Sequence, residues 1–569
     1  MKDFSIRIKI VALFFIVVAL LFASRLFYLQ IVHGSDYTER ADNQYLRPAN
    51  NLFDRGSIFF TTKDGVQVSA ATLKTGFIVA VNPQQITNPE IAWQKLTVFL
   101  PTLDQVKFLA QVADQTDPYE EVATHVDKTV ADKIKQAKIT GVSVFKQKWR
   151  FYPAGRNASH AIGFLGYKGD VYNGRYGLEK QYESVLSRNR DGLFVNFFAE
   201  LFSDFNRAVK SKTVGQAGDI VLTIEPLVQN MLEKELDAYT SKWQPDSVTG
   251  IIINPQTGEI YAVASRPNFD PGEKQTDIAV LNNQLVEKFY EMGSIFKPLT
   301  MAAALDLNLV TASTTYKDTG CITLNTKKVC NFDGKARGVI PMQEVLSQSL
   351  NTGSAFVGLK LGAKNLRDYF HGYGFGEKTS IDLPDEVLGL TTNLDKKPRE
   401  VEVANMSFGQ GIAVTPIQTV RALSVLANGG KLVRPHLVKQ INYKNLLVDE
   451  IGTIVERHVL KPETSREISR MLTTVVDTKL ADGRVKMSHY SIAAKTGTAQ
   501  IAKTTSGGYY DDRYLHSFFG YFPATNPRFL IFFMSVYPKG ATYSSQTLTD
   551  PFINLNRFLI NYYQVLPDR

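Results

Sequence analysis

The sequence predicts an α+β protein of several domains whose largest domain lies at the carboxyl end. Its 569 residues are too many for one hydrophobic core, because cores stop growing near about 250–300 residues. In the second half of the chain two strand-like segments come first, helical segments follow, and three strand-like segments come last. This order predicts a domain in which helices flank an antiparallel sheet built from both ends of the domain.

Composition narrows the class of protein further. With 44% hydrophobic and 21% charged residues the chain is neither disordered nor a coiled coil, and a mean hydropathy of −0.12 excludes several membrane spans. The net charge of +9 comes from well-mixed charges without a basic block, which argues against nucleic-acid binding. The 2 cysteines are too few for a disulfide scaffold or a thiolate metal cluster.

The amino terminus predicts a membrane anchor. Residues 10–32, uncharged apart from Arg25, are long enough at 1.5 Å per residue to cross a bilayer as a helix. Residues 1–9 carry three basic side chains against one acidic side chain, which places this tail in the cytoplasm and the rest of the chain outside. A cleaved signal peptide is the alternative. Residues 21–25, LFASR, lack the small-residue cleavage pattern, so the retained anchor is favoured.

The exported part divides into two regions. Residues 33–215 alternate short strand-like and helical segments without catalytic motifs, which is typical of a spacer or docking domain, here called the pedestal. Residues 216–569 hold the α+β domain, which opens with a strand and an amphipathic helix beginning at Pro226. Its further expected elements are a hairpin at 248–265, helices at 294–309, 341–361, 416–427 and 465–476, and strands at 490–500, 516–524 and 528–537.

Three short motifs in this domain combine residues that suit nucleophilic catalysis. Ser294 and Lys297 open an expected helix, Ser349 and Asn351 follow, and residues 495–498 read Lys-Thr-Gly-Thr. Positions i and i+3 share a helical face, so Lys297 reaches the hydroxyl of Ser294. A lysine that is partly desolvated near a second cation loses proton affinity and can act as a neutral base toward a serine.

The three motifs differ in specificity. A serine three residues before a lysine is a weak signal, and the chain has a second instance at Ser143 and Lys146. There the flanking residues alternate like a strand, so the two side chains face opposite sides. The Lys-Thr-Gly-Thr string is a stronger signal, because a charged residue and a glycine inside an apolar strand both need a reason. The order and context of all three motifs favour a catalytic site over helix caps and turns.

Together the motifs resemble the signature of the penicillin-recognising serine acyltransferases, which are the penicillin-binding proteins and serine β-lactamases. The segments at 290–300, 404–418 and 492–500 resemble catalytic-domain signatures of the class B penicillin-binding proteins, and those at 150–166 and 174–183 resemble motifs of their pedestal domain. The resemblance covers nearly the whole exported chain and implies a monofunctional transpeptidase. After residues 55–58 the chain departs from the family pattern, so whether Arg55 makes the pedestal contact of the family is left open.

The resemblance implies a role for each residue of the first two motifs. Ser294 is implied to be the nucleophile and Lys297 the base of acylation. Ser349 is implied to relay a proton to the leaving amine. Asn351 is implied to orient Lys297 and to bind the substrate amide.

The third motif is implied to bind the substrate along its strand. Lys495 supplies positive charge, the hydroxyls of Thr496 and Thr498 hold the terminal carboxylate, and Gly497 lets the substrate approach the strand closely. Backbone N–H groups of Ser294 and Thr498 would form the oxyanion hole. No metal or organic cofactor is implied.

The implied substrate is a peptidoglycan stem peptide ending in D-Ala-D-Ala, which is cross-linked with release of D-alanine, and β-lactams would acylate the same serine. The anchor and pedestal argue against a β-lactamase. A D,D-carboxypeptidase, a β-lactam sensor and a non-catalytic cell-wall scaffold are the alternatives.

The segments at 346–362 and 373–389 resemble division-type members more than elongation-type members, which favours a septal role over one in the lateral wall. The implied partners are a polytopic glycan-polymerising glycosyltransferase and other division proteins, bound through residues 10–215 at the inner membrane of a bacterium.

Cys321 and Cys330 flank an expected hairpin with a turn at 325–328. Outside the cytoplasm a cross-strand disulfide between them is one alternative, and two free thiols are the other.

Overall fold

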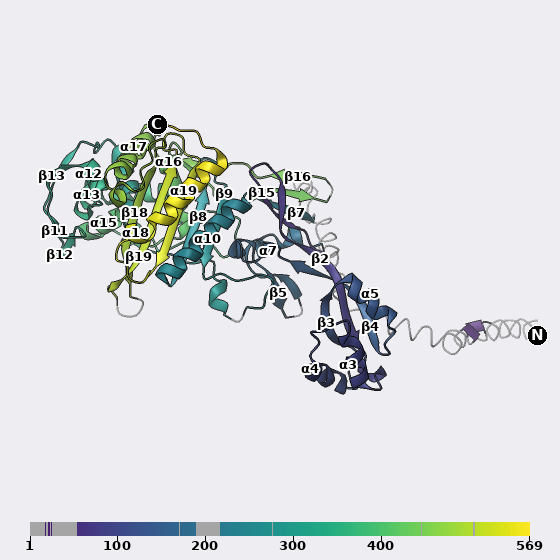
Figure 1. Cartoon of the computed structure of the whole chain (residues 1–569). Coiled ribbons are helices and arrows are strands. Elements are labelled where there is room, and N and C mark those ends of the chain that lie inside the picture. Colours follow the sequence, from purple (N-terminus) through teal and green to yellow (C-terminus); the bar gives the residue numbers. More distant parts are fainter. Residues whose placement is uncertain are drawn as a thin grey trace, which may run out of the picture. The chain divides into compact units, whose positions relative to one another are not determined.

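The computed structural model describes residues 54–169, 171–188, 217–275, 277–444, 446–503 and 507–569, together with residues 18, 21, 22, 24 and 25. The described residues form two compact units (Figure 1). The first unit contains Asp54 and Leu73–Trp149, and the second contains Arg55–Thr72 and Arg150–Arg569. Most of the expected membrane segment 10–32 and the expected boundary near residue 215 lie outside the described residues. Within those residues, no helix is both long and apolar enough to cross a bilayer.

The first unit is a small group of helices and strands. Its elements are the carboxyl part of β2 (Gln67–Val81), η3 (Pro83–Gln85), α3 (Pro89–Thr97), α4 (Gln105–Ala113), β3 (Glu120–Val126), α5 (Lys128–Gln136) and β4 (Val142–Phe151). Asn88 and Asp104 cap α3 and α4 by accepting the backbone N–H of the residue three positions on. The Ser143–Lys146 segment lies in β4, so its reading as a strand is confirmed.

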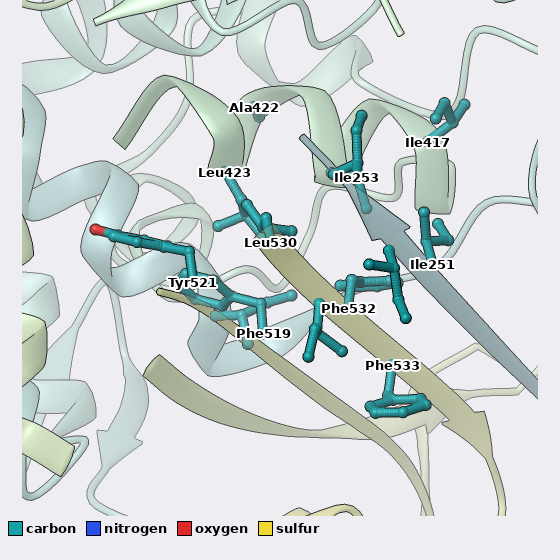
Figure 2. Packing of buried hydrophobic residues seen from close by; sticks show 14 of the residues in the cluster. Ile251, Ile253, Ile417, Ala422, Leu423, Phe519, Tyr521, Leu530, Phe532 and Phe533 are labelled. Carbon is teal, nitrogen blue, oxygen red and sulfur yellow. The ribbon is translucent and has the colours of Figure 1, made fainter. Parts of the chain in front are cut away.

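A five-stranded antiparallel sheet forms the centre of the second unit. Its strand order is β18 (Ala493–Ala502), β19 (Tyr509–Phe522), β20 (Phe529–Val536), β8 (Ser247–Ile253) and β9 (Ile260–Arg266). The predicted sheet with strands from both ends of the domain is therefore confirmed, and β18, which carries the Lys-Thr-Gly-Thr motif, is an edge strand. Figure 2 shows Ile251, Ile253 and Leu530 packed beneath the helix that carries Leu423, whereas Phe533 points to the opposite face.

Helices cover both faces of this sheet. The first is α10 (Pro226–Trp243), which begins at the predicted proline and is capped by the Glu225 carboxylate. The second unit also contains α11 (Lys297–Asp306), α12 (Met342–Ser347), α13 (Asn351–Gly372), α14 (Thr392–Asp395), α15 (Glu400–Ser407), α16 (Pro416–Ala427), α17 (Pro462–Thr478), α18 (Ser544–Thr547) and α19 (Thr549–Tyr563). Of these, α16, α17, α18 and α19 pack against the sheet. The single helix expected at 341–361 is wrong: the chain breaks between α12 and α13, where Ser349 has a φ of 56°. A left-handed residue cannot continue a right-handed helix.

Short strands and 3₁₀ turns complete the second unit. They are β1 (Ile58–Thr61), β5 (Leu165–Lys168), β6 (Val171–Gly174), β7 (Gly218–Leu222), β10 (Thr315–Asp318), β11 (Cys321–Leu324), β12 (Lys327–Cys330), β13 (Gly338–Pro341), β14 (Lys431–Val433), β15 (Val438–Tyr443), β16 (Val448–Glu450), β17 (Val455–His458), η4 (Ile278–Leu281), η5 (Gly293–Phe296) and η6 (Leu480–Gly483). The strands β11 and β12 form the expected hairpin, and Cys321 and Cys330 are joined by a disulfide across its open end.

A buried ion-pair cluster lies in the part of the second unit that includes α6 (Ser159–Ile162), α7 (Gly177–Gln181) and α8 (Glu183–Leu186). The Arg55 guanidinium pairs with Glu179 at 2.7 Å and with Glu183 at 2.7 Å, and Arg150 pairs with Glu179 at 2.6 Å. Arg150 also donates to the Gly56 carbonyl at 2.6 Å. The sequence left a contact of Arg55 open, and the structure supplies one from a segment more than a hundred residues away.

Candidate active site

The three motifs meet in one groove of about 730 Å³ beside the edge strand β18. Of the predicted site residues, Ser294, Ser349, Asn351, Lys495, Thr496 and Thr498 line the groove. Lys297 and Gly497 are buried directly behind this lining. The groove is therefore built from segments that are far apart in the sequence, namely η5, the break between α12 and α13, and β18.

Ser294 lies in η5, a 3₁₀ turn that runs directly into α11. A 3₁₀ turn has three residues per turn, so Ser294 and Lys297, the first residue of α11, lie on the same side of the chain. The hydrogen bonds of the Lys297 ammonium go to Ser349, so its predicted reach to the Ser294 hydroxyl stays a prediction. The turn is held to the sheet by the Ser517 hydroxyl, which donates to the Met292 carbonyl at 3.0 Å. Gly293, with a φ of 65°, supplies the left-handed residue that the entry into the turn requires.

Two buried lysines converge on Ser349. The ammonium of Lys297 donates to the Ser349 carbonyl at 2.5 Å and to its hydroxyl at 3.2 Å. Lys495 donates to the same hydroxyl at 3.0 Å and to the Thr496 carbonyl at 3.0 Å. The left-handed conformation of Ser349 places its carbonyl and hydroxyl together at this point, so the helix break is part of the site.

The two lysines are poised to lose their protons. Burial and, secondarily, the charge of Lys495 lower the pKa of Lys297 well below its ordinary value. Burial also lowers the pKa of Lys495 to about 7. The hydrogen-bond partners of both amines are hydroxyl and carbonyl oxygens, which do not restore the lost proton affinity as a carboxylate would. A neutral amine next to a serine is what general-base activation requires.

Asn351 begins α13, and its side chain points toward the disulfide hairpin. Its amide donates to the Cys330 carbonyl at 2.9 Å. Asn351 is expected from the family resemblance to orient Lys297, whereas the hydrogen bonds of the Lys297 ammonium go to Ser349. Asn351 still lines the groove.

Gly497 has a structural reason that the sequence did not reveal. A Cβ at this position would lie 2.4 Å from the Ser517 hydroxyl and 2.9 Å from the Met292 carbonyl. The glycine therefore lets the turn that carries Ser294 pack against β18. Successive residues of a strand face opposite sides, so Thr496 and Thr498 line the groove while Gly497 faces the turn.

The sequence did not mark Ser544, which lines the groove, or His516, which is buried outside the groove lining. The Ser544 backbone N–H donates to the Thr498 hydroxyl at 3.1 Å, and that hydroxyl donates to the Ser544 hydroxyl at 3.3 Å. His516 lies opposite Thr498 in the β18–β19 ladder. No short motif marks either residue. For His516 the alternation of apolar residues in β19 indicates which face of the sheet its side chain occupies, but not which residue of β18 lies opposite it.

Comparison with known proteins places this geometry in a family. Residues 248–554 match the penicillin binding protein transpeptidase domain, and residues 54–193 match the penicillin-binding protein dimerisation domain. The stage V sporulation protein D of Bacillus subtilis is 32% identical over 96% of this chain and 84% of its own length. The peptidoglycan D,D-transpeptidase FtsI of Buchnera aphidicola subsp. Schizaphis graminum is 25% identical over 98% of this chain and 95% of its own length.

A solved structure shares the fold. The crystal structure of penicillin binding protein 2X from Streptococcus thermophilus superposes with a TM-score of 0.72 and 21% identity, covering 90% of this chain and 79% of that one. The chain therefore belongs to the penicillin-binding protein transpeptidases. The dimerisation domain that precedes the transpeptidase domain identifies it as a member of class B.

Proposed function

We propose that this class B penicillin-binding protein is a peptidoglycan D,D-transpeptidase that works through an acyl-enzyme on Ser294. The observation that carries the proposal is the pair of buried lysines, Lys297 and Lys495, that converge on Ser349 beside the nucleophile. The domain match and the names of the relatives support the same reaction class.

Acylation uses the neutral amine of Lys297. The Ser294 hydroxyl attacks the carbonyl carbon between the two D-alanines of a stem peptide, and Lys297 takes the hydroxyl proton. The C–N bond then breaks, and Ser349, hydrogen-bonded to both lysines, passes a proton to the departing amine. D-alanine leaves and an ester of Ser294 remains.

The strand β18 positions the donor. The hydroxyls of Thr496 and Thr498 hold the terminal carboxylate, and the backbone N–H groups of Ser294 and Thr498 stabilise the oxyanion. Asn351, which lines the groove, binds the amide of the peptide. The amine of a second stem peptide then attacks the ester, the C–O bond to Ser294 breaks, and the cross-link is complete. Water in place of the amine would make the enzyme a carboxypeptidase.

We assign the protein to the bacterial inner membrane. The apolar segment 10–32 serves as a single retained span, residues 1–9 stay in the cytoplasm, and the pedestal and transpeptidase domain of residues 33–215 and 216–569 work outside. A polytopic glycosyltransferase that supplies the glycan strands, together with other division proteins, is the partner we expect for the span and the pedestal.

Labelling with a fluorescent penicillin tests the nucleophile. β-Lactams resemble the donor, so membranes that contain the wild-type chain should carry a covalent label that Ser294→Ala abolishes. The matched control is Ser143→Ala, which removes the serine of the second Ser-x-x-Lys segment in β4 and should label like wild type. Loss of label in the control but not in Ser294→Ala would overturn the assignment.

Depletion of the protein in its host tests the cellular role. The resemblance to division-type members favours septal synthesis, so depleted cells should grow into filaments. Rounded cells would instead place the enzyme in the lateral wall. Normal growth with defective spores would place it in the setting for which the Bacillus subtilis relative is named.

A further inference from the structure

Ser544 contributes a hydroxyl to the groove that the mechanism above does not use. The residue is only 2% exposed, yet it lines the groove beside Thr498. Its backbone N–H donates to the Thr498 hydroxyl at 3.1 Å, which occupies an acceptor position of that hydroxyl and leaves its proton free to point elsewhere.

The hydrogen bonds at this point leave donors for an anion. The Thr498 proton points to the Ser544 hydroxyl over a long 3.3 Å. Among the described residues, the Ser544 hydroxyl contacts Thr498 alone and acts there as the acceptor, so its own proton has no partner. When a carboxylate lies along β18, both hydroxyl protons can turn to it. A carboxylate has about four lone-pair sites, more than Thr496 and Thr498 fill.

His516 fixes the segment that carries Ser544. Directly opposed residues of an antiparallel pair share a face, so His516 lies on the same face of the sheet as Thr498, beneath α18. The imidazole Nε2 lies 3.1 Å from the Thr542 carbonyl, and Nδ1 lies 2.8 Å from the Thr547 hydroxyl. A carbonyl can only accept, so Nε2 carries the hydrogen, and Nδ1 accepts from Thr547 in the neutral ring.

The imidazole is therefore hydrogen-bonded to the first and the last residue of the segment 542–547. Burial lowers the pKa of His516 to about 4, in keeping with this neutral tautomer. The ring is fully buried and lines no part of the groove, so it acts on the substrate only through the segment above it.

We infer that Ser544 is a further substrate-binding residue for the terminal carboxylate of the donor, and that His516 is the positioning residue that holds Ser544 against β18. The inference rests on the proposed function, because it extends the carboxylate site of Thr496 and Thr498. If it holds, loss of Ser544 weakens the reaction only with donors that end in a carboxylate, whereas loss of the chemistry at Ser294 stops the reaction with every donor.

Carboxylate binding by Ser544 is separated from the chemistry at Ser294 by assaying the full-length enzyme in detergent with two thioester donors. One donor ends in a carboxylate and the other in the primary amide at the same position. Ser544→Ala should lower kcat/KM for the carboxylate donor about tenfold, mainly through KM, because a hydrogen bond to a charged group is lost. The amide donor should be nearly unaffected. Ser143→Ala, which removes a serine hydroxyl of β4 outside the groove lining, is the control and should change the kcat/KM of neither donor.

An equal loss for both donors would overturn the role of Ser544, because a structural disturbance does not distinguish them. If the wild-type enzyme fails to form an ester on Ser294 with either donor, the proposed function itself is wrong, and this result differs from any outcome for Ser544.

Variants of His516 test the positioning role. His516→Ala should cause the same selective loss for the carboxylate donor, and His516→Gln, which can still donate to the Thr542 carbonyl, should recover part of it. Thr547→Val is a second route to the same loss if the His516 variants fold poorly. Thermal unfolding of each variant verifies the fold. A folded His516→Ala that keeps the wild-type ratio between the two donors would overturn this part of the inference.

Discussion

The buried cations of this chain have two kinds of surroundings. Arg55 and Arg150 share the carboxylate of Glu179, and Arg55 also pairs with Glu183, so their charges are compensated inside the second unit. Lys297 and Lys495 are equally buried, but they contact hydroxyl and carbonyl oxygens. Burial without a counter-charge lowers a lysine pKa, whereas a carboxylate partner would raise it. Burial of a cation therefore has two outcomes in this chain. Beside Glu179 the buried arginines form ion pairs, whereas at Ser349 the buried Lys297 can become a neutral base.

The two lysines predict a bell-shaped pH dependence for acylation. Lys297 must be neutral to accept the serine proton, so the rate rises as pH increases through its lowered pKa. Lys495 must keep its charge beside the donor carboxylate, so kcat/KM falls above pH about 7. Because the two amines are close, the limbs report the titration of the pair.

The variant Lys495→Ala distinguishes the two limbs. The alkaline limb should disappear, since no charge is left to lose at that position. The acid limb should move to higher pH, because the cation that lowers the pKa of Lys297 is gone. The measurement is the residual acylation rate with the carboxylate thioester between about pH 5 and pH 10, a range on both sides of pH 7 and up to the ordinary pKa of a lysine. An unchanged acid limb would show that Lys495 does not act on Lys297.

At the scale of elements, the sequence predicts those helices and strands that are determined by residues close together along the chain. The strand of Lys495 and the helix at Pro226 are marked by alternation and by a proline in the first turn, and both are present. The helix break at Ser349 was missed because its carbonyl and hydroxyl are held by lysines from two distant segments. Ser544 was missed for the same reason, since its contact with Thr498 depends on packing rather than pattern.

The disulfide hairpin β11–β12 is tied to the groove by one buried carboxylate. Asp318 accepts from the Thr352 hydroxyl at 2.8 Å and from the Asn331 amide at 3.0 Å. It also accepts the backbone N–H of Arg337 at 2.9 Å. These bonds join the segment after the hairpin to the first turn of α13, where Asn351 binds the Cys330 carbonyl. Asp318 thus holds the hairpin wall of the groove in place.

The variant Asp318→Asn should loosen this wall. An amide has one acceptor oxygen, so it leaves buried donors unpaired and places an NH₂ group among them, at a cost of about 1–3 kcal/mol. We expect a lower unfolding midpoint and slower penicillin acylation, both measurable on one preparation. Asp333→Asn is the control, because that carboxylate lies in the same loop and pairs with Arg337 near the surface. Equal effects of the two variants would contradict the special role of Asp318.

At the scale of the whole molecule, the described chain passes between its two compact units at residues 54–55, 72–73 and 149–150. Arg55 and Arg150 are each the first residue of the second unit after one of these passages. Both reach the carboxylate of Glu179, which is fully buried. The Glu179 side chain thus holds both points at which the chain enters the second unit. This role explains why Arg55 has an acidic partner that the sequence did not predict.

Removing the charge of Glu179 should therefore destabilise the second unit more than any surface ion pair does. Glu179→Gln leaves two buried guanidinium groups without their shared carboxylate, which costs about 3–5 kcal/mol. Lys180→Gln is the matched control, since it breaks the exposed pair with Asp385, and such pairs contribute about 0–1 kcal/mol. Thermal unfolding of the full-length protein in detergent should show a much lower midpoint for Glu179→Gln. The groove is built from other segments, so the variant should still bind penicillin at low temperature. A midpoint equal to that of Lys180→Gln would show that the two arginines are compensated by other groups.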